Sequence, residues 1–423
     1  MKRVFSLALT ALLLAGCGST PAASSTTNTA VTAETAAAEA SVGSGEPLRL
    51  LQHGDEKQYY LREGLDNTET WIRYRIVDLG ECTDYIPCDV DGCTHDSESC
   101  QAVFPYAFGS MPWVLDENTL LAMEYSFDDE RTTLFLMDRE CHNRRELATL
   151  DNCNLFTYSN QAYTDGKALY VRGEQNDRDG LYRVDLADGT LTEVYSFSLG
   201  NSYVVGVIGR TCLIGQSQVT YPDPTGDLIA DAQAEPTGTK TQFLLNVDTG
   251  ETRELRTFSS EDGSLNAIET YVVDDVCYSF NSSTGTLSTV DWNTGAEHPI
   301  TDQMPLPAEY ESPTDYNIEA NLNGWLVFYN LPVIVNAETG EVRQRADLPE
   351  NLWNGYGHQP QIFLQLKDRL LVDCRYEPYT RTTLSTDGTP YTIEGDQMYL
   401  GLISIDDFLN GVPNYTEVCK APY

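Results

Sequence analysis

The chain has 423 residues, of which 64 are acidic and 26 are basic, and its formal net charge at pH 7 is −38. This excess of negative charge excludes binding to nucleic acid or to an anionic lipid surface through charge, because both would repel the protein. The length and the 41% of hydrophobic residues allow a large buried core that needs no disulfide scaffold.

The first residues, MKRVFSLALTALLLAGC, have the pattern of an export signal. Lys2 and Arg3 precede an apolar run, residues 4–15, that is too short for an ordinary membrane span. The run ends in LAGC, which is similar to a lipobox, the bacterial signal after which cleavage leaves a lipid-carrying cysteine. The pattern predicts a signal peptide over residues 1–16, palmitate-type lipidation of Cys17, and a protein held at the extracytoplasmic face of the cell membrane. The alternative is a plain secretory signal that happens to contain a cysteine.

Residues 17–47 consist mostly of Ser, Thr, Ala and Gly and contain almost no bulky apolar side chains. Such a segment cannot bury enough surface to offset the entropy that ordering would cost. We therefore expect a flexible tether, which would reach about 30 Å at roughly 5–6 Å times the square root of the residue number. Without residues 1–16 the chain keeps 24 basic and 64 acidic residues, a balance that favours solubility or affinity for cations or a basic partner.

From residue 48 onward the chain repeats one pattern. Seven times an extended segment ends in an apolar residue followed by Asp or Asn: Val77-Asp78, Met137-Asp138, Val184-Asp185, Leu245-Asn246, Val290-Asp291, Val335-Asn336 and Ile405-Asp406. Four of these continue into a hairpin turn with glycine where a positive φ is needed: DLADGT, NVDTGE, DWNTGA and NAETGE. A second class of hairpin precedes these ends, so each unit of roughly 50 residues contains four strands. The repeat predicts an all-β fold, a single β-propeller over residues 48–423 with seven four-stranded blades, six or eight being the alternatives.

The repeat also assigns connections to the two ends of the disc. In a four-stranded blade, the connections between strands one and two and between strands three and four lie at one end, and the tight DG and TG turns belong to this tight-turn end. The other connections lie at what we call the long-loop end, and five long segments are predicted there: 82–104, 217–241, 299–316, 348–360 and 375–396. Because loops on a rigid scaffold commonly carry function, this end is the predicted ligand-binding face.

Several side chains in these long segments are suited to contact with a sugar or a peptide. They are aromatic or polar, and their alternative role is to anchor the loops on the propeller: Tyr221, Tyr310, Tyr316, Trp353, Tyr356, His358 and Tyr379. No G-x-S-x-G, H-E-x-x-H or G-x-x-x-x-G-K-[ST] motif is present in the sequence, so no catalytic residue is predicted. Two classes of function follow: a lipoprotein that binds an extracellular ligand or partner protein, and an exported carbohydrate-active hydrolase or lyase.

The ten cysteines after Cys17 fall into two groups. Cys212 and Cys277 occupy equivalent positions in second strands, where a small buried core residue is expected. The stretch CDVDGCTHDSESC, residues 88–100, permits three kinds of site. Three thiolates and an imidazole could bind structural zinc, using Cys88, Cys93, His95 and Cys100. Disulfides could form among these cysteines and nearby Cys82 instead. Calcium is a weaker alternative, through Asp89, Asp91 and Asp96, because the run is too short for a full calcium loop. The remaining alternative is a polar loop whose thiols have no role.

The lipobox, the low-complexity tether and the D-x-x-T-G turns together resemble bacterial lipoproteins with a quinoprotein-like, or YVTN-like, β-propeller. The Cys-x4-Cys-x-His-x4-Cys block is similar to one found in surface lipoproteins of anaerobic Firmicutes, mostly of unassigned function. The tryptophan that quinoprotein propellers place four residues after the turn glycine is absent, since Glu193, Glu254, Pro299 and Gln344 occupy those positions. The resemblance therefore implies the fold and the anchored location, without a quinone cofactor.

Overall fold

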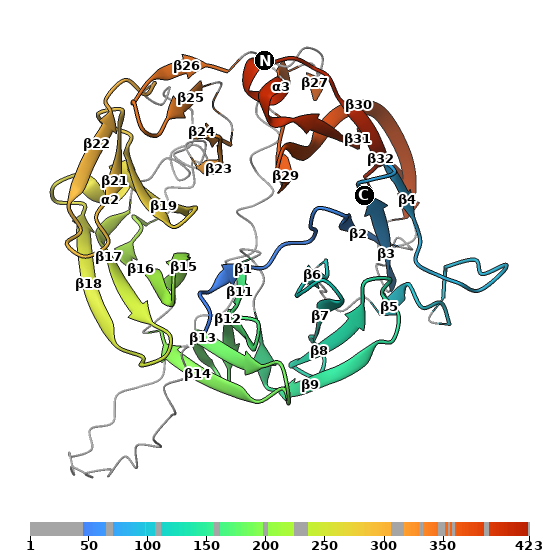
Figure 1. Ribbon diagram of the computed structural model, residues 1–423. Helices are drawn as coiled ribbons and strands as arrows, with labels where there is room; N and C mark the ends of the chain where they lie inside the picture. The colour runs from blue at the N-terminus through green and yellow to red at the C-terminus, as the bar shows by residue number, and fades with distance from the viewer. Residues whose placement is uncertain are drawn as a thin grey trace, which may run out of the picture. The chain divides into compact units, whose positions relative to one another are not determined.

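The strands of successive units share one pattern of burial. In β3 (Trp71–Asp78) and β8 (Arg131–Asp138), the side chains alternate in the same way between buried and half-buried positions. This alternation gives each sheet two packing faces. In the computed structural model, seven such sheets lie in a ring (Figure 1). The structure describes residues 45–64, 71–97, 99–105, 111–155, 161–197, 202–223, 236–305, 317–329, 331, 333–345, 352–353, 356–357, 360–384 and 389–421.

Each blade is an antiparallel sheet built from consecutive strands. Blade 1 contains β2 (Gln58–Gly64), β3, β4 (Thr83–Tyr85) and β5 (Val103–Pro105). Blade 2 contains β6 (Trp113–Val114), β7 (Thr119–Ser126), β8 and β9 (Arg145–Asp151). Blade 3 contains β11 (Ala162–Thr164), β12 (Ala168–Gln175), β13 (Arg178–Asp185) and β14 (Leu191–Ser196), with the short strands β1 (Arg49–Leu50) and β10 (Cys153–Asn154) added. Blade 4 contains β15 (Ser202–Ile208), β16 (Thr211–Thr220), β17 (Thr237–Asn246) and β18 (Thr252–Ser259).

The remaining blades follow the same plan. Blade 5 contains β19 (Ile268–Val273), β20 (Val276–Asn281), β21 (Thr286–Val290) and β22 (Glu297–Thr301), and blade 6 contains β23 (Ile318–Leu322), β24 (Trp325–Phe328), β25 (Val333–Asn336) and β26 (Val342–Gln344). Blade 7 contains β29 (Ile362–Gln365), β30 (Arg369–Leu384), β31 (Pro390–Ser404) and β32 (Thr416–Lys420). A small hairpin, β27 (Leu352–Trp353) with β28 (Tyr356–Gly357), and two short helices, α2 (Ser264–Ala267) and α3 (Ile405–Asn410), complete the described elements. The prediction of seven four-stranded blades is confirmed.

The hydrophobic core is divided into seven clusters, and each cluster lies between two neighbouring blades. The cluster between blades 7 and 1 contains Tyr59 and Val77 from blade 1 and Leu371 and Leu400 from blade 7. Blade 7 is complete with C-terminal strand β32, and blade 1 is built only from N-terminal residues. Over the described residues, the ring is therefore closed by side-chain packing and not by a blade that combines strands from both ends of the chain.

Residues 45–54 run along the inside of the ring before blade 1 begins (Figure 1). The N–H of Leu48 donates to the carbonyl of Gly209 in blade 4 over 2.8 Å, and β1 pairs with β11 of blade 3. Gln52 then accepts a hydrogen bond from Val114 of blade 2, and Gly54 bridges to Tyr59 in blade 1. We call residues 45–54 the N-terminal segment. It contacts four blades in turn, so it is part of the propeller core.

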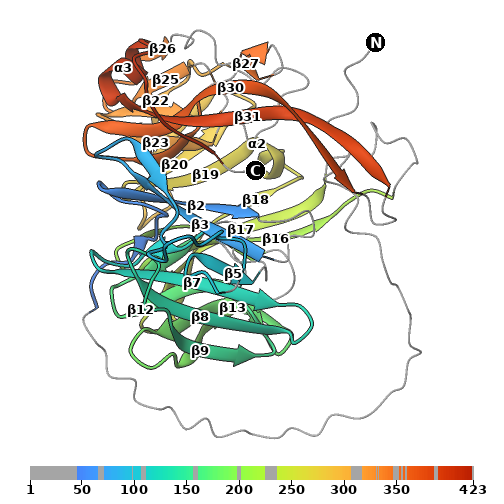
Figure 2. The ribbon, with the colours of Figure 1, turned by 90° about the vertical axis from the view of Figure 1, so that its right-hand side faces the viewer.

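The two long hairpins, β16–β17 and β30–β31, extend from the same side of the ring (Figure 2). For the described parts of segments 217–241 and 375–396, the predicted placement at one end is therefore confirmed. The placement of residues 82–104 is wrong. Both β4 and β5 pair with β3, so the segment interrupts the outermost strand of blade 1 and projects from the rim. The repeat pattern did not predict this insertion, because a segment inserted within a strand is not marked by a turn motif. Within the described residues, neither helix has the length and apolar character that a membrane span requires.

Candidate functional site

The tight-turn end is occupied by polar contacts between neighbouring turns. Arg210 donates to Asp165 over 3.1 Å, to Asp248 over 2.6 Å and to the carbonyl of Glu46 over 2.7 Å, and so fastens the N-terminal segment to blades 3 and 4. Burial alone would raise the pKa of Asp165, but hydrogen bonds from Lys167 and Ala168 and the Arg210 guanidinium lower it. This carboxylate therefore stays charged and holds the guanidinium in place.

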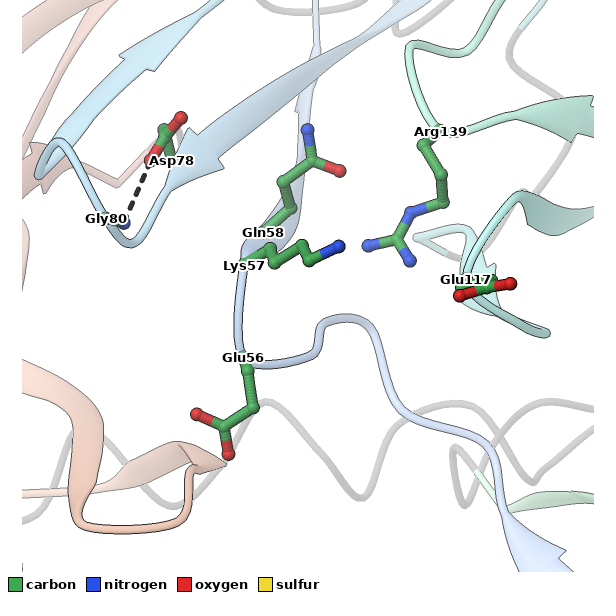
Figure 3. Close-up of a pocket in the computed structure, with 7 residues that line it drawn as sticks. All are labelled: Glu56, Lys57, Gln58, Asp78, Gly80, Glu117 and Arg139. Carbon is green, nitrogen blue, oxygen red and sulfur yellow. Dashed lines mark hydrogen bonds between the residues drawn. The ribbon is translucent and has the colours of Figure 1, made fainter.

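A polar pocket of about 430 Å³ lies at the same end, between the turns of blades 1 and 2 (Figure 3). Its lining includes Lys57, Asp78, Glu117 and Arg139. The Arg139 guanidinium already donates to Asp55 over 2.8 Å and to the Tyr60 hydroxyl over 2.8 Å. Because these bonds engage the Arg139 guanidinium in joining blades 1 and 2, we interpret the pocket as a structural contact between the two blades.

The long-loop end carries a different kind of surface. Over the described residues, four aromatic side chains are more than a third exposed at connections between the second and third strands of a blade. They are Phe127 in blade 2 (57% exposed), Tyr221 in blade 4 (66%), Tyr329 in blade 6 (37%) and Tyr391 in blade 7 (47%). Tyr85, on the outer strand β4, is the other exposed aromatic residue (37%), and its hydroxyl donates to Glu140. The exposed aromatic surface is thus concentrated at the long-loop end.

The predicted ligand-binding residues are only partly described. Tyr221 is one of the four exposed aromatic residues. Tyr379 is half-buried on β30, where its ring lies beside Gly395. Blades 4 and 7, which carry these two residues, lie across the ring from each other (Figure 1). The backbones of Trp353 and Tyr356 pair in the small hairpin β27–β28. Tyr310, Tyr316 and His358 lie outside the described residues, as does Cys17, so their roles remain predictions.

Three of the four exposed aromatic residues, Phe127, Tyr329 and Tyr391, were not among the predicted site residues. The repeat contained a signal for them, because each lies at or next to the end of a second or third strand on the long-loop side. What the repeat could not provide is their exposure, since an aromatic residue at a strand end can equally fold back onto the blade.

A buried polar cluster lies near the long-loop end between blades 6 and 7. Glu319 on β23 accepts a hydrogen bond from the N–H of Ile362 over 2.6 Å, and burial raises the pKa of its carboxyl group to about 8. Asp373 on β30 is fully buried and accepts hydrogen bonds from the N–H of Gln361 over 2.5 Å and from the Tyr376 hydroxyl over 2.7 Å. Glu319 therefore holds a proton at neutral pH. The nearby Asp373 carboxyl group is stabilised by a backbone N–H and a phenol hydroxyl, which both donate hydrogen bonds to it. The sequence contained one signal for this cluster, a single acidic residue, Glu319, within the mostly apolar strand β23. Sequence analysis did not identify it as a site residue.

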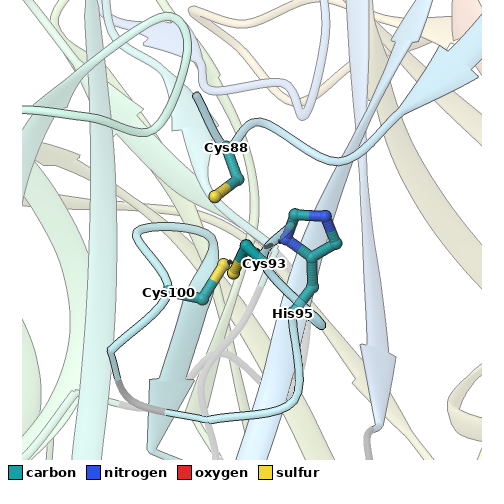
Figure 4. A group of neighbouring side chains, drawn as sticks. All are labelled: Cys88, Cys93, His95 and Cys100. Atoms are coloured by element: carbon teal, nitrogen blue, oxygen red, sulfur yellow. Dashed lines mark hydrogen bonds between the residues drawn. The ribbon is translucent and has the colours of Figure 1, made fainter. Parts of the chain in front are cut away.

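The Cys/His cluster, Cys88, Cys93, His95 and Cys100, comes together in the segment between β4 and β5 (Figure 4). One ligand atom from each residue lies within 4.8 Å of the others, and Nδ1 of His95 is 3.4 Å from Sγ of Cys100. Cys82 is not part of it and packs against the core between blades 7 and 1. Cys212 and Cys277 are buried in their second strands, as predicted.

The thiols of this cluster differ in their electrostatic surroundings. Burial raises the pKa of Cys100 to about 12, and the thiols of Cys88 and Cys93 contribute to the rise. Burial also opposes ionisation of Cys88, but hydrogen bonds from the N–H of Val90 and from the other two thiols outweigh it and lower the pKa of Cys88. Cys88 therefore ionises before Cys100.

No family model matches the chain, and no curated protein matches it. Among solved structures, TolB from Acinetobacter baumannii is 12% identical with a TM-score of 0.35, and the match covers 84% of this chain and 79% of that one. The β-propeller domain of the Trilobed protease from Pyrococcus furiosus is 9% identical with a TM-score of 0.43, covering 86% and 99%. Oligogalacturonate lyase from Vibrio parahaemolyticus is 11% identical with a TM-score of 0.40, covering 83% and 97%. These likenesses concern the architecture and carry no information about the ligand or reaction of this chain.

Proposed function

We propose that the protein is a bacterial surface lipoprotein, anchored at the extracytoplasmic face of the cell membrane, that binds an extracellular ligand or partner protein through its long-loop end. The observation that carries the proposal is the concentration of exposed aromatic side chains at this end, in Phe127, Tyr221, Tyr329 and Tyr391. Aromatic side chains combine a large apolar face with low conformational freedom, and for this reason they are favoured in binding surfaces.

The spread of these residues indicates a large ligand. They come from blades 2, 4, 6 and 7, so a ligand that contacts several of them at once must extend across the ring. A surface polymer or a folded protein has that size. The net charge of −38 disfavours a polyanion. We therefore expect a neutral or basic macromolecule.

Photo-crosslinking in living cells tests the proposal even though the ligand is unidentified. A photo-reactive phenylalanine is placed at Tyr221 or Tyr391, and the controls carry it at Tyr85 on the rim or Val412 at the tight-turn end, which are also exposed. We expect a discrete adduct from the first pair only. Equal adducts from all four positions, or adducts only from the controls, would contradict the assignment of the binding face.

An exported carbohydrate-active hydrolase or lyase is the second candidate. The observation that favours it is Glu319, which holds a proton at neutral pH as a general acid must. The burial of Asp373 stands against it, because a substrate could not touch a fully buried carboxylate. Release of reducing ends from neutral polysaccharides by the wild-type protein, lost in Glu319→Gln, would favour the enzyme. Absence of cleavage by the wild type would leave the binding function alone.

A further inference from the structure

We propose that Cys88, Cys93, His95 and Cys100 bind one structural Zn²⁺ ion, which ties together the two halves of the interrupted outer strand of blade 1. This proposal is independent of the ligand-binding function, because the site lies within the interrupted outer strand of blade 1 and not in a connection between second and third strands.

The arrangement of the four ligand atoms is that of a tetrahedral zinc site. With Zn–S bonds of about 2.3 Å and Zn–N bonds of about 2.0 Å, tetrahedral ligands lie roughly 3.5–3.8 Å apart. In the structure all four ligand atoms lie within 4.8 Å of one another, and the His95 nitrogen is 3.4 Å from the Cys100 sulfur. The sulfur atoms and the imidazole face one another in Figure 4. An ion needs only a small contraction of the cluster to be fully coordinated.

The backbone of the segment is shaped to bring these side chains together. Gly92 and His95 both have positive φ, of 76° and 56°, and the N–H of Cys93 closes a turn onto Val90 over 3.1 Å. A positive φ is disfavoured for any residue with a side chain, and it persists where the surroundings require it. The Arg73 guanidinium donates to the carbonyl of His95 over 3.2 Å, which fixes this residue against β3.

The composition of the cluster favours a metal over disulfides. A bridge uses two thiols, so one of the three cysteines would stay unpaired and His95 would have no role. The fourth nearby thiol, Cys82, could complete a second pair, but it packs against a different core cluster. Calcium is disfavoured because Asp89, Asp91 and Asp96 are exposed around the cluster, while thiolate and imidazole ligands suit zinc.

The site holds a segment that has few other supports. Cys100 packs with Ala102 and Val103 in a small cluster separate from the seven cores between blades. On the other side, His142 of blade 2 contacts the carbonyl of Pro87 over 3.2 Å and lies 3.5 Å from the Asp89 carboxylate. Four protein ligands leave zinc no open position for a substrate, so its role is structural.

Metal analysis of the intact, detergent-extracted lipoprotein tests the proposal. Elemental analysis and native mass spectrometry should find one zinc per chain, and chelation should expose three additional thiols to alkylation. The variants Cys93→Ser and His95→Ala should lower zinc affinity by roughly 100-fold or more. Cys82→Ser is the matched control and should retain one zinc.

Cobalt replacement provides a readout that does not depend on stability. The Co²⁺ protein should show the absorption of tetrahedral cobalt with thiolate ligands, and this absorption should disappear in His95→Ala or Cys93→Ser while the far-ultraviolet circular dichroism of the propeller is retained. A metal-free chain that is two hydrogens lighter, with thiols resistant to alkylation before reduction, would show disulfides and overturn the proposal. Retention of full zinc by both ligand variants would overturn it as well.

Discussion

At the scale of single residues, burial decides which polar side chains have unusual properties. Glu319 is the clearest case. One carboxylate oxygen accepts the Ile362 N–H, and the other has no hydrogen-bond partner among the described residues. Burial raises the pKa of this group to about 8, with Arg345 acting to lower it and Asp373 to raise it. The neutral form is therefore the one that the folded protein accommodates.

The stability of the protein should depend on pH through this residue. The pKa of Glu319 is higher in the folded chain than the ordinary value of 4.5, so its contribution is complete below that value and is lost as the pH rises through about 8. Between pH 5 and pH 9 the free energy of unfolding should fall by roughly 2–4 kcal/mol from this group. Glu124, whose pKa burial raises to about 7, adds to the trend.

Urea unfolding of Glu319→Gln across this pH range measures the effect. The variant should lose much of the pH dependence, whereas Glu261→Gln, which removes an exposed carboxylate, should follow the wild type. Parallel curves for the wild type and Glu319→Gln would show that the carboxyl group is not held in its neutral form.

At the scale of elements, the N-terminal segment contributes to the propeller core in a way that the sequence did not predict. Leu48 is inserted in the core between blades 3 and 4, and Leu51 in the core between blades 2 and 3. Between them, β1 adds a strand to the inner edge of blade 3. A segment that directly follows a low-complexity tether therefore contributes to two of the seven cores.

Substitutions within this segment should distinguish a core element from a linker. Leu51 is 2% exposed, and Leu51→Ala should lower the free energy of unfolding by about 2–5 kcal/mol because it leaves a cavity. The neighbouring Leu50 is 41% exposed and is the matched control, with an expected change within about 0.5 kcal/mol. Chemical denaturation compares the two, and equal effects would mean that the segment does not pack as the structure indicates.

The insertion in blade 1 shows what local patterns can and cannot predict about an element. Residues 83–85 and 103–105 both pair with β3, so they share one strand position although seventeen residues separate them. The spacing of the cysteines and His95 predicted a metal or disulfide site. It did not predict that Cys82 would lie elsewhere, because that residue packs against the core between blades 7 and 1, which forms only when the two blades meet.

At the scale of the whole molecule, the two ends of the disc differ in structure. The tight-turn end receives the N-terminal segment and is joined by ion pairs such as those of Arg210 and Arg139. The long-loop end carries the projecting hairpins and the exposed aromatic side chains. The two ends therefore differ in their connections and in their exposed side chains.

The anchor itself is tested by Cys17→Ala. Without this cysteine there is no site for lipid attachment, so the protein should be released into the medium or retained unprocessed with its signal peptide. Cell fractionation with mass determination measures the outcome, and Cys82→Ala serves as a control that removes a thiol from the propeller. A Cys17→Ala protein that remains with the membranes at its normal mature mass would contradict the lipid anchor.

The sequence by itself determined the local architecture. Alternating burial and glycine-containing turns depend on residues only a few positions apart, so the repeat predicted the blades, their number, and the end from which β16–β17 and β30–β31 project. The position of Cys212 and Cys277 within the repeat likewise predicted that both residues lie in the core.

Only the tertiary structure decided the contacts that join distant parts of the chain. Arg49 pairs opposite Thr164, and Tyr59 packs in one cluster with Cys419. Such contacts depend on how the ring closes, and no turn or periodicity specifies that. The burial of Glu319 and the separation of Cys82 from the Cys/His cluster also depend on contacts between neighbouring blades, which the chain brings together only in the folded ring.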